Sequence, residues 1–437
     1  MAAAAVPTTN GSATRRARWT YSDRILSRPG AYVDEEDGFV PGEAPITSVE
    51  NARILVIGAG GLGCEILKNL ALSGFKKIDV IDMDTIDVSN LNRQFLFREK
   101  DVGQPKATVA ANFVMKRVPG CTITPYVGKI QDKDQDYYLQ FNIVVCGLDS
   151  IEARRWINAT LVDLVDMENP DSLKPLIDGG TEGFKGQSRV IFPTMTSCIE
   201  CQLDMHAPRA AVPLCTLASI PRQPQHCIEW AHIIKWEEER KDVTLDTDDP
   251  EHITWLYKKA LARAQEYNIS GVTYSMTQGV VKNIIPAIAS TNAIIAASCC
   301  NEAYKIATTC APCIGMPGQN NYMLYTGDTS VYTYTFEHQK KDDCPVCGNL
   351  PKDLVVNPTS TLGDLVESFA ERPESQLKKP NLRSEGKSLY YSSPASLMAQ
   401  TKGNLVKPLN ELLSDGEEIA VTDPAFSTVF KYRVHFS

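Results

Sequence analysis

The chain has 437 residues, of which 43% are hydrophobic and 22% charged, and its net charge is −9 at pH 7. This length suggests about two or three domains, and the composition is typical of a soluble globular protein. The acidic balance and the lack of a basic block argue against nucleic acid as a main partner. The most apolar region, residues 280–300, contains Lys282 and Pro286, so we expect a buried core helix there and no membrane span.

Apolar runs alternate with helical spacing in the first half of the chain. Strands are predicted at residues 53–57, 78–81, 142–146, 175–177 and 188–192, with helices near 65–73 and 106–116. This alternation predicts an α/β fold with a mainly parallel sheet and crossover helices.

The alternation of predicted strands and helices ends after residue 205. Residues 206–274 are rich in charge and in Trp, Tyr and His, which predicts a helical insertion, and an apolar helix over 277–305 then returns to the core. The last part of the chain alternates like a small α+β domain. We therefore expect a disordered tail at 1–20, a first domain at 21–205 and 275–345, an inserted domain at 206–274, and a C-terminal domain at 346–437.

Gly58, Gly60 and Gly63 fit the pattern G-x-G-x-x-G, after a predicted strand and at the start of a predicted helix. Glycines there let the backbone approach a phosphate, and the helix N-terminus supplies N–H donors. Asp82, at the end of the second predicted strand, stands where a ribose-binding acid is expected. The loop therefore indicates a nucleotide, with NAD as the default ligand and a tight turn without a ligand as the alternative.

The residues after the second and third predicted strands favour a triphosphate over a dinucleotide. Asn90, Arg93 and Lys106 follow the second strand, and cations that converge there suit the charge of ATP and of its cleavage. Asp149 follows the third strand, where a carboxylate is well placed to hold Mg²⁺ on phosphates. Each residue alone is more often a surface charge, so the prediction rests on their joint placement on one rim.

Thirteen cysteines occur, and six of them form three Cys-x-x-Cys pairs. In a long enzyme-like chain this favours metal binding or thiol chemistry in a reducing compartment, and we expect the cytoplasm and nucleus. Two such pairs make a closed, structural Zn²⁺ site. The compact turn CPVCG favours the pair Cys344/Cys347, whereas Cys310/Cys313 could be redox-active or incidental, so the choice of pairs stays open at this point.

Cys215 lies in PLCTLASIPR, residues 213–222, with no partner cysteine two or three residues away. The prolines on both sides exclude a regular helix throughout the segment. The residues alone do not separate a buried small hydrophobe from a reactive thiol.

Several motifs together resemble the ubiquitin-like-protein activating enzymes. GAGGLGCE, IDMDTIDVSNLNRQFLF, GQPKA, CGLDS and GTEGFKG are similar to their adenylation domain, and PLCTLASIPR is similar to their catalytic-cysteine segment. The resemblance is closest to the branch that serves the neddylation pathway, and it is specific through residue 347. It implies a Rossmann-like adenylation domain, a catalytic-cysteine insertion, and a C-terminal ubiquitin-like β-grasp domain that recruits a conjugating enzyme.

The resemblance also implies a reaction, in which the chain uses ATP to activate a ubiquitin-like modifier and holds it as a thioester. The implied roles are a phosphate loop at Gly58, Gly60 and Gly63, ribose binding by Asp82, phosphate contacts from Asn90, Arg93 and Lys106, Mg²⁺ at Asp149, zinc at Cys198, Cys201, Cys344 and Cys347, and the thioester on Cys215. Because the chain holds one adenylation unit, a regulatory subunit of related fold is expected as its partner. The pair Cys310/Cys313 departs from the family pattern.

Two arginines have further possible roles at the reaction site. Arg222 could lower the pKa of the Cys215 thiol, and Arg189 could meet the tail of the modifier, with a surface arginine as the alternative. Competing functions are an NAD(P)-dependent oxidoreductase with a structural zinc, and a non-catalytic adaptor that uses the adenylation fold to bind a partner.

Overall fold

The computed structural model describes most of the chain in two compact units. They consist of Met1–Ala207 with Ala287–Ser437, and of Pro208–Pro286. The described residues are 18–30, 33, 39–166, 168–206, 221–241, 243, 245–246, 249–281, 287–316, 319–348, 351–372, 375–384, 387–392, 395–424 and 429–437. The predicted tail at 1–20 falls almost wholly outside them.

An eight-stranded sheet forms the centre of the first unit. Its strands are β1 (Arg53–Ile57), β2 (Lys77–Asp82), β3 (Thr122–Val127), β4 (Ile143–Cys146), β5 (Leu176–Glu182), β6 (Lys185–Ile191), β7 (Tyr322–Thr326) and β8 (Tyr332–Phe336). The order is β3-β2-β1-β4-β5-β6-β7-β8, parallel from β3 to β5 and antiparallel from β5 to β8. The mainly parallel sheet predicted from the sequence is confirmed, and β3, β7 and β8 were not among the predicted strands.

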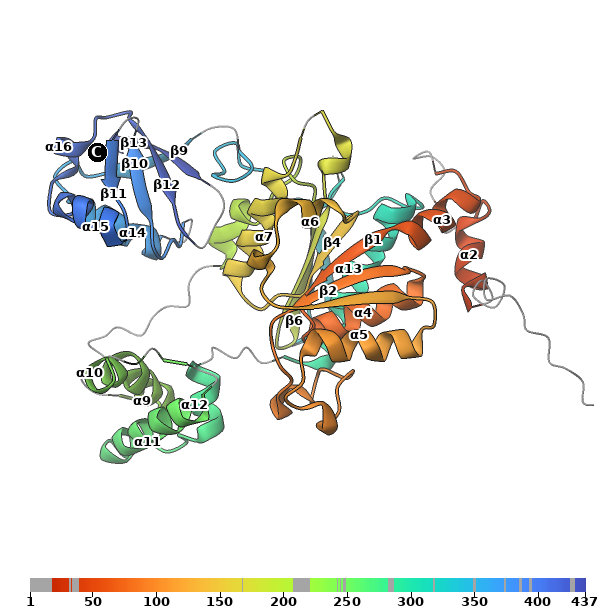
Figure 1. Cartoon of the computed structure of the whole chain (residues 1–437), viewed down its shortest axis with the longest axis horizontal. Helices are drawn as coiled ribbons and strands as arrows, with labels where there is room; N and C mark the ends of the chain where they lie inside the picture. The colour runs from red at the N-terminus through yellow and green to blue at the C-terminus, as the bar shows by residue number, and fades with distance from the viewer. Residues whose placement is uncertain are drawn as a thin grey trace, which may run out of the picture. The chain divides into compact units, whose positions relative to one another are not determined.

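Helices cover both faces of this sheet (Figure 1). They are α2 (Thr20–Leu26), α3 (Glu43–Asn51), α4 (Gly61–Ser73), α5 (Lys106–Arg117), α6 (Gln135–Leu139), α7 (Ile151–Asp163) and α13 (Ala289–Thr308), with short helices η1 (Val88–Asn90), η2 (Glu99–Asp101), η3 (Ile130–Asp132), η4 (Pro170–Ser172) and η5 (Glu200–His206). Side chains alternate along β1, because Ile54 and Val56 pack with α4, α5 and α13, whereas Leu55 and Ile57 pack with α6 and α7.

The strand order reverses between β1 and β4, which are parallel neighbours. The chain runs from β1 to β2 on one side of this pair and from β4 to β5 on the other side. In such sheets, ligands bind in the crevice between the carboxyl ends of the two strands where the order reverses. The glycine loop follows β1, and Asp149 follows β4. The topology therefore brings the predicted nucleotide-binding segments to one edge of the sheet.

The predicted single helix over 277–305 is wrong. The structure has α12 (Tyr274–Val281) in the second unit, and α13 begins only at Ala289. Pro286 lies in the sequence between them, and a proline lacks the N–H that a continuous helix needs. The apolar character of this segment predicts its two helices, but not the break between α12 and α13.

The second unit is helical. It contains α9 (Pro224–Glu229), a π-helical turn η6 (Trp230–Lys235), α10 (Trp236–Glu239), α11 (Pro250–Glu266) and α12. Cys227, Trp236 and Leu256 belong to its own hydrophobic core. The predicted helical insertion is thus confirmed as a fold element, while its proposed catalytic Cys215 lies outside the described residues.

The C-terminal part of the first unit has a separate five-stranded sheet and core. Its strands run in the order β11-β10-β12-β13-β9, and β9 is parallel to β13. The elements are β9 (Lys352–Val356), α14 (Leu362–Glu371), β10 (Asn381–Ser384), β11 (Lys387–Tyr390), α15 (Ala395–Thr401), η7 (Lys402–Asn404), α16 (Leu409–Leu412), β12 (Glu418–Thr422) and β13 (Phe430–Phe436). This is the expected β-grasp arrangement.

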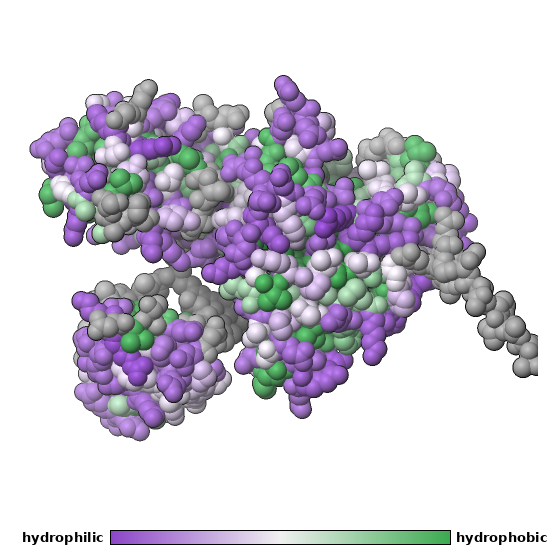
Figure 2. Space-filling model, in the orientation of Figure 1, coloured by the Kyte–Doolittle hydropathy of each residue, from purple (hydrophilic) through white to green (hydrophobic). Residues whose placement is uncertain are grey.

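The face that Figure 2 shows is mainly hydrophilic, with small apolar patches. In the part of the chain that the structure describes, every helix is too short or too polar to cross a bilayer.

Candidate active site

At two positions of the glycine loop between β1 and α4, Gly58 and Gly63, the structure leaves no room for a side chain. Gly58 has φ +96°, and a Cβ atom on it would lie 2.6 Å from the carbonyl oxygen of Gly147. A Cβ atom on Gly63 would overlap the carbonyl oxygen of Gly58. The N-cap of α4 is Gly60, which offers no side-chain hydrogen bond. The first N–H groups of α4 therefore receive no cap from this residue and can serve an anion.

Asp82 holds this loop in place. Its carboxylate accepts hydrogen bonds from the backbone N–H of Ala59 at 2.6 Å and from that of Asp84 at 2.8 Å. Burial raises the pKa of Asp82, while the N–H of Ala59 and the cation of Lys106 act in the opposite direction. The side chain lies at the predicted place beside the loop, and its contact with a ribose stays a prediction.

Arg93 lies against the start of α4. A Cβ atom on Gly61 would be 3.4 Å from Cγ of Arg93. Burial lowers the pKa of Arg93, and the negative charge of Asp149 acts to raise it. Asp149 is exposed between β4 and α7. The Arg93 guanidinium and the Asp149 carboxylate, which could bind a metal ion, are therefore close enough to interact electrostatically.

Asn90 and Lys106 have structural partners. Oδ1 of Asn90 accepts the backbone N–H of Asp87 at 2.9 Å, which caps η1. Nζ of Lys106, at the first residue of α5, lies 2.7 Å from the Asp84 carboxylate. The Lys106 cation also lowers the pKa of Asp82. Both residues lie in the segments that flank the loop, and their contacts with phosphate remain predictions.

A buried charge cluster lies behind this edge of the sheet. The carboxylate of Asp178 accepts hydrogen bonds from Arg154 at 2.9 Å and from Arg189 at 3.0 Å. Arg189 also donates to Gln202 and is fully buried. The alternative that Arg189 is a surface arginine is therefore wrong, because its side chain completes a buried ion pair. A modifier tail would have to reach a guanidinium that is already held on two sides.

Four cysteines from distant parts of the sequence come together. Sγ of Cys198 lies 3.9 Å from that of Cys201 and 3.6 Å from that of Cys344, and Sγ of Cys201 lies 3.4 Å from that of Cys347. All four ligand atoms lie within 4.8 Å of one another, and all four residues are buried. Tetrahedral Zn–S bonds of about 2.3 Å place sulfur atoms roughly 3.8 Å apart. The donor set and its spacing therefore fit a structural zinc ion.

Neighbouring groups hold this cluster. Arg155 of α7 binds Glu200 through two hydrogen bonds, of 2.5 and 3.0 Å, and Glu200 lies between two of the cysteines in the sequence. The backbone N–H of Lys341 donates to Sγ of Cys201. By contrast, Cys310 and Cys313 are buried near the end of α13 and do not join the cluster.

Cys215, the thiol predicted to form the thioester, belongs to residues 207–220, which lie outside the described residues. Arg222 is described, and its backbone N–H donates to Nδ1 of His226 at 3.3 Å. Its influence on the Cys215 thiol stays a prediction.

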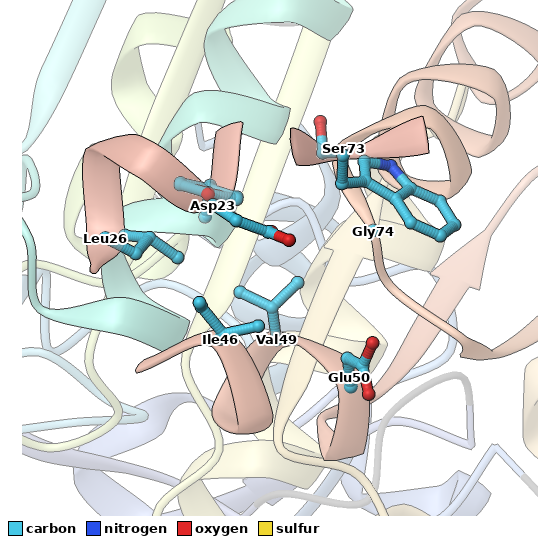
Figure 3. A pocket seen from close by; sticks show the side chains of 9 residues that line it. Asp23, Leu26, Ile46, Val49, Glu50, Ser73 and Gly74 are labelled. Carbon is cyan, nitrogen blue, oxygen red and sulfur yellow. The ribbon is translucent and has the colours of Figure 1, made fainter. Parts of the chain in front are cut away.

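Two cavities lie away from the glycine loop. One of about 20 Å³ lies at the C-terminal end of α4, where α2 and α3 pack (Figure 3). Since α4 has 13 residues, this is roughly 20 Å along the helix from the loop. The other, of about 450 Å³, is lined by Met195, Thr196, Ser197, Met316, Gln319, Asn321, Glu337, His338, Gln339 and Lys340. Neither is the predicted nucleotide site.

Sequence reasoning missed two carboxamides beside the loop. Nε2 of Gln94 lies 3.8 Å from the position of a Cβ atom on Gly60, and Nδ2 of Asn292 lies 2.5 Å from that on Gly61. Gln94 directly follows Arg93 in the sequence, so its place beside the loop could have been predicted together with that of Arg93. Asn292 sits in an apolar helix far along the chain, and only the fold brings it to the loop.

Comparisons with known proteins agree with this geometry. Residues 38–346 match the ThiF family, and residues 355–436 match the E2 binding domain. The NEDD8-activating enzyme E1 catalytic subunit of Dictyostelium discoideum is 51% identical over 429 residues, covering 93% of this chain and 94% of that protein. The proteins of the same name from Caenorhabditis elegans and Schizosaccharomyces pombe are 50% and 45% identical, covering 95% of this chain and 97% and 95% of theirs.

A solved structure of Escherichia coli MccB with MccA-N7isoASN is 21% identical, with a TM-score of 0.45 and coverage of 71% of each chain. The family match decides between the two interpretations of the glycine loop, in favour of adenylation over hydride transfer. The chain belongs to the ThiF family and, within it, to the E1 catalytic subunits that these relatives represent.

Proposed function

We propose that this chain adenylates the C-terminal glycine of the neddylation-type modifier at the Gly58–Gly63 loop and then carries it as a thioester on Cys215. ATP-dependent activation of a ubiquitin-like modifier, followed by transfer to a conjugating enzyme, is the activity of the E1 catalytic subunits to which the chain belongs. The observation that carries the site assignment is the tight loop at the N-terminus of α4, in which Gly58 and Gly63 leave no room for a side chain, with Arg93 against it.

The first step joins the modifier to AMP. A carboxylate oxygen of the modifier attacks the α-phosphorus of ATP, and the bond to pyrophosphate breaks. Negative charge grows on the phosphate oxygens, and in this proposal the N–H groups of α4 and the cations of Arg93 and Lys106 stabilise it. Asp82 keeps the loop in position and has acceptor capacity left for a ribose hydroxyl.

Asp149 would hold Mg²⁺ on the phosphates. Its carboxylate is exposed at the carboxyl end of β4, and oxygen ligands of this kind suit the ion. When bound, Mg²⁺ neutralises part of the charge of the triphosphate.

The second step transfers the acyl group to sulfur. A thiolate of Cys215 attacks the acyl carbon, the bond to the AMP oxygen breaks, and AMP leaves. Cysteine suits this role because a thiolate is accessible near neutral pH and its thioester remains transferable. A thiol of the conjugating enzyme then accepts the modifier.

Zinc would be held by Cys198, Cys201, Cys344 and Cys347 and would act structurally, since four protein ligands leave no open position. It would tie the segment after β6 to the segment that leads into the C-terminal domain.

Three partners are part of the proposal. The E2 binding domain implies a conjugating enzyme. A regulatory subunit of related fold is expected because the chain carries one adenylation unit, and the neddylation modifier is supported by the names of the relatives. We place the activity in the cytoplasm and nucleus, where thiols stay reduced.

Modifier-dependent exchange of labelled pyrophosphate into ATP tests this function. The chain and its proposed partner subunit are incubated with each member of a panel of purified modifiers. We expect exchange with the neddylation modifier, and little with ubiquitin or a sulfur carrier. Substitution of Arg93 by Leu should abolish exchange, while Arg117→Leu, at the far end of α5, should preserve it. Exchange with a different modifier would overturn the choice of substrate, and exchange without any modifier would overturn the proposed reaction.

A further inference from the structure

Arg154, near the start of α7, is a buried cation with three hydrogen-bond acceptors. The residue is 7% exposed. Its Nε donates to Oδ1 of Asp178 at 2.9 Å, and its Nη2 donates to the carbonyl oxygens of Leu148 at 2.6 Å and of Gly179 at 3.0 Å. Leu148 follows β4, and Gly179 belongs to the neighbouring strand β5. One guanidinium therefore ties the segment after β4 to β5.

The Leu148 carbonyl belongs to the short turn that carries Asp149. At the start of this turn, the backbone N–H of Gly147 donates to a carbonyl oxygen of β1 at 2.9 Å. At its end, the side chain of Ser150 caps α7. Arg154 holds the carbonyl between these two points. Because the side chain of Asp149 is exposed, its position depends on this backbone more than on packing.

The guanidinium also brings a positive charge to the turn. Burial lowers the pKa of Arg154, but the Asp178 carboxylate outweighs burial, and Asp149 acts in the same direction as Asp178, so this pKa is raised. Arg154 and Asp149 are thus close enough to interact electrostatically. A guanidinium has N–H donors and no acceptor, so Arg154 does not itself bind a metal ion. Any effect of Arg154 on a metal must pass through the turn.

We propose that Arg154 is a positioning residue for the metal site, whose hydrogen bond to the Leu148 carbonyl fixes the turn that presents the Asp149 carboxylate to Mg²⁺. The inference rests on the proposed function, because it takes Asp149 as the ligand of Mg²⁺ on the phosphates of ATP. When this hydrogen bond is lost, the turn has more freedom, and metal binding must then order it. Arg154 removes that cost in advance.

A purely structural role makes a different prediction. If Arg154 served only to pair with Asp178, its replacement would lower the stability of the protein and leave metal binding unchanged. Arg154→Lys keeps a cation for Asp178, but an ammonium does not reproduce the planar fork that reaches three acceptors. The matched control is Arg155→Lys, at the next position of α7. Arg155 is 1% exposed and binds Glu200 beside the zinc cluster through two hydrogen bonds.

The test measures binding of Mn²⁺, a spectroscopic substitute for Mg²⁺, to the full chain with its partner subunit and a non-hydrolysable ATP analogue. Electron paramagnetic resonance gives the concentration of free Mn²⁺. Loss of a hydrogen bond from a charged group should make Mn²⁺ binding roughly 10-fold weaker in Arg154→Lys. Arg155→Lys should bind Mn²⁺ like the wild type. Amide hydrogen exchange at residues 147–150 should be faster in Arg154→Lys than in Arg155→Lys.

A double variant separates positioning from a general loosening of the site. If Arg154 acts through Asp149, Arg154→Lys combined with Asp149→Ala should bind Mn²⁺ no more weakly than Asp149→Ala alone. Additive losses would show that Arg154 acts by another route, and they would overturn the inference. Arg154→Gln, which leaves Asp178 bound to Arg189, gives a second replacement with the same expected result, should Arg154→Lys fail to fold.

The remaining outcomes distinguish the inference from the proposed function. Wild-type Mn²⁺ affinity in Arg154→Lys, with a lowered melting temperature, would assign Arg154 to the buried ion pair alone and reject the inference. Equal weakening of Mn²⁺ binding in Arg155→Lys would reject it as well. Wild-type Mn²⁺ affinity in Asp149→Ala would instead overturn the proposed metal site itself.

Discussion

The carboxylate of Asp82, at the end of β2, accepts a hydrogen bond of 2.6 Å from the backbone N–H of Ala59 in the glycine loop after β1. The same carboxylate accepts the N–H of Asp84 at 2.8 Å. One acidic side chain thus joins the ends of two parallel neighbouring strands at the point where the nucleotide is proposed to bind. The geometry of the loop depends on this carboxylate before any ligand arrives.

Replacement of Asp82 by Ala should weaken ATP binding. A hydrogen bond to a charged group contributes about 1.5–3 kcal/mol, so the loss of loop bracing corresponds to at least about a 10-fold weaker affinity. Asp82→Asn keeps one acceptor oxygen and should have a smaller effect. Equilibrium binding of labelled ATP checks this, with Asp136→Ala on the exposed side of α6 as the control. Equal affinity in Asp82→Ala and in the control would contradict the bracing role.

Gly63→Ala should abolish nucleotide binding. Alanine normally stabilises a helix by about 1 kcal/mol relative to glycine. In α4, however, the new Cβ would overlap the carbonyl oxygen of Gly58, so the loop must open. Gly279→Ala in α12 meets no heavy atom within 4 Å and should be neutral or slightly stabilising. Melting curves and ATP titration of both variants give the comparison, and a Gly63→Ala protein that binds ATP normally would reject the tight-loop explanation.

Asp178→Asn should destabilise the adenylation domain, because two buried arginines lose their carboxylate. Breaking a buried ion pair costs about 3–5 kcal/mol. Burial raises the pKa of Asp178, but Arg154 and Arg189 outweigh it and hold that pKa below its ordinary value of 3.8.

The sign of the pH dependence follows from this lowered pKa. The ionised carboxylate contributes stability above the unfolded-state pKa of about 3.9, and this is lost as pH falls through the lower folded-state pKa. The difference in denaturation midpoint between wild type and Asp178→Asn should therefore be full at pH 7 and shrink below about pH 4. A difference that stays constant from pH 7 to pH 3 would show that the Asp178 charge contributes nothing.

Zinc content should depend on Cys344 and not on Cys313. We expect about one zinc ion per chain in the wild type, its loss in Cys344→Ser, and its retention in Cys313→Ser. Elemental analysis of the purified proteins gives these ratios. A strong chelator should lower the melting temperature of the wild type and leave that of Cys344→Ser unchanged. Zinc lost from Cys313→Ser and kept in Cys344→Ser would reverse the assignment of the pairs.

Much of the central sheet could be predicted because buried parallel strands are short apolar runs. The predicted strand at 53–57 coincides with β1, and the prediction at 78–81 lies within β2. β3 was missed because it lies at the sheet edge, is largely exposed and contains Pro125. β8 was missed although its aromatic residues alternate with threonines, and most of its residues are exposed.

The candidate site was predictable only where its residues follow strands in the sequence. Asp82 and Asp149 could be placed because parallel strands end at the same edge. The choice among three cysteine pairs depended on a contact between residues 146 positions apart, which spacing does not reveal. Asn292 reaches the loop from α13, beyond the whole inserted unit, so no local pattern marks it.

Formation of a thioester on Cys215 tests the central claim most directly. The full chain with its partner subunit is incubated with ATP, Mg²⁺ and the neddylation modifier, and the products are separated with and without reducing agent. We expect a reducible adduct with the wild type, none with Cys215→Ala, and continued pyrophosphate exchange by that variant. A reducible adduct that persists in Cys215→Ala, or one that forms without ATP, would contradict it.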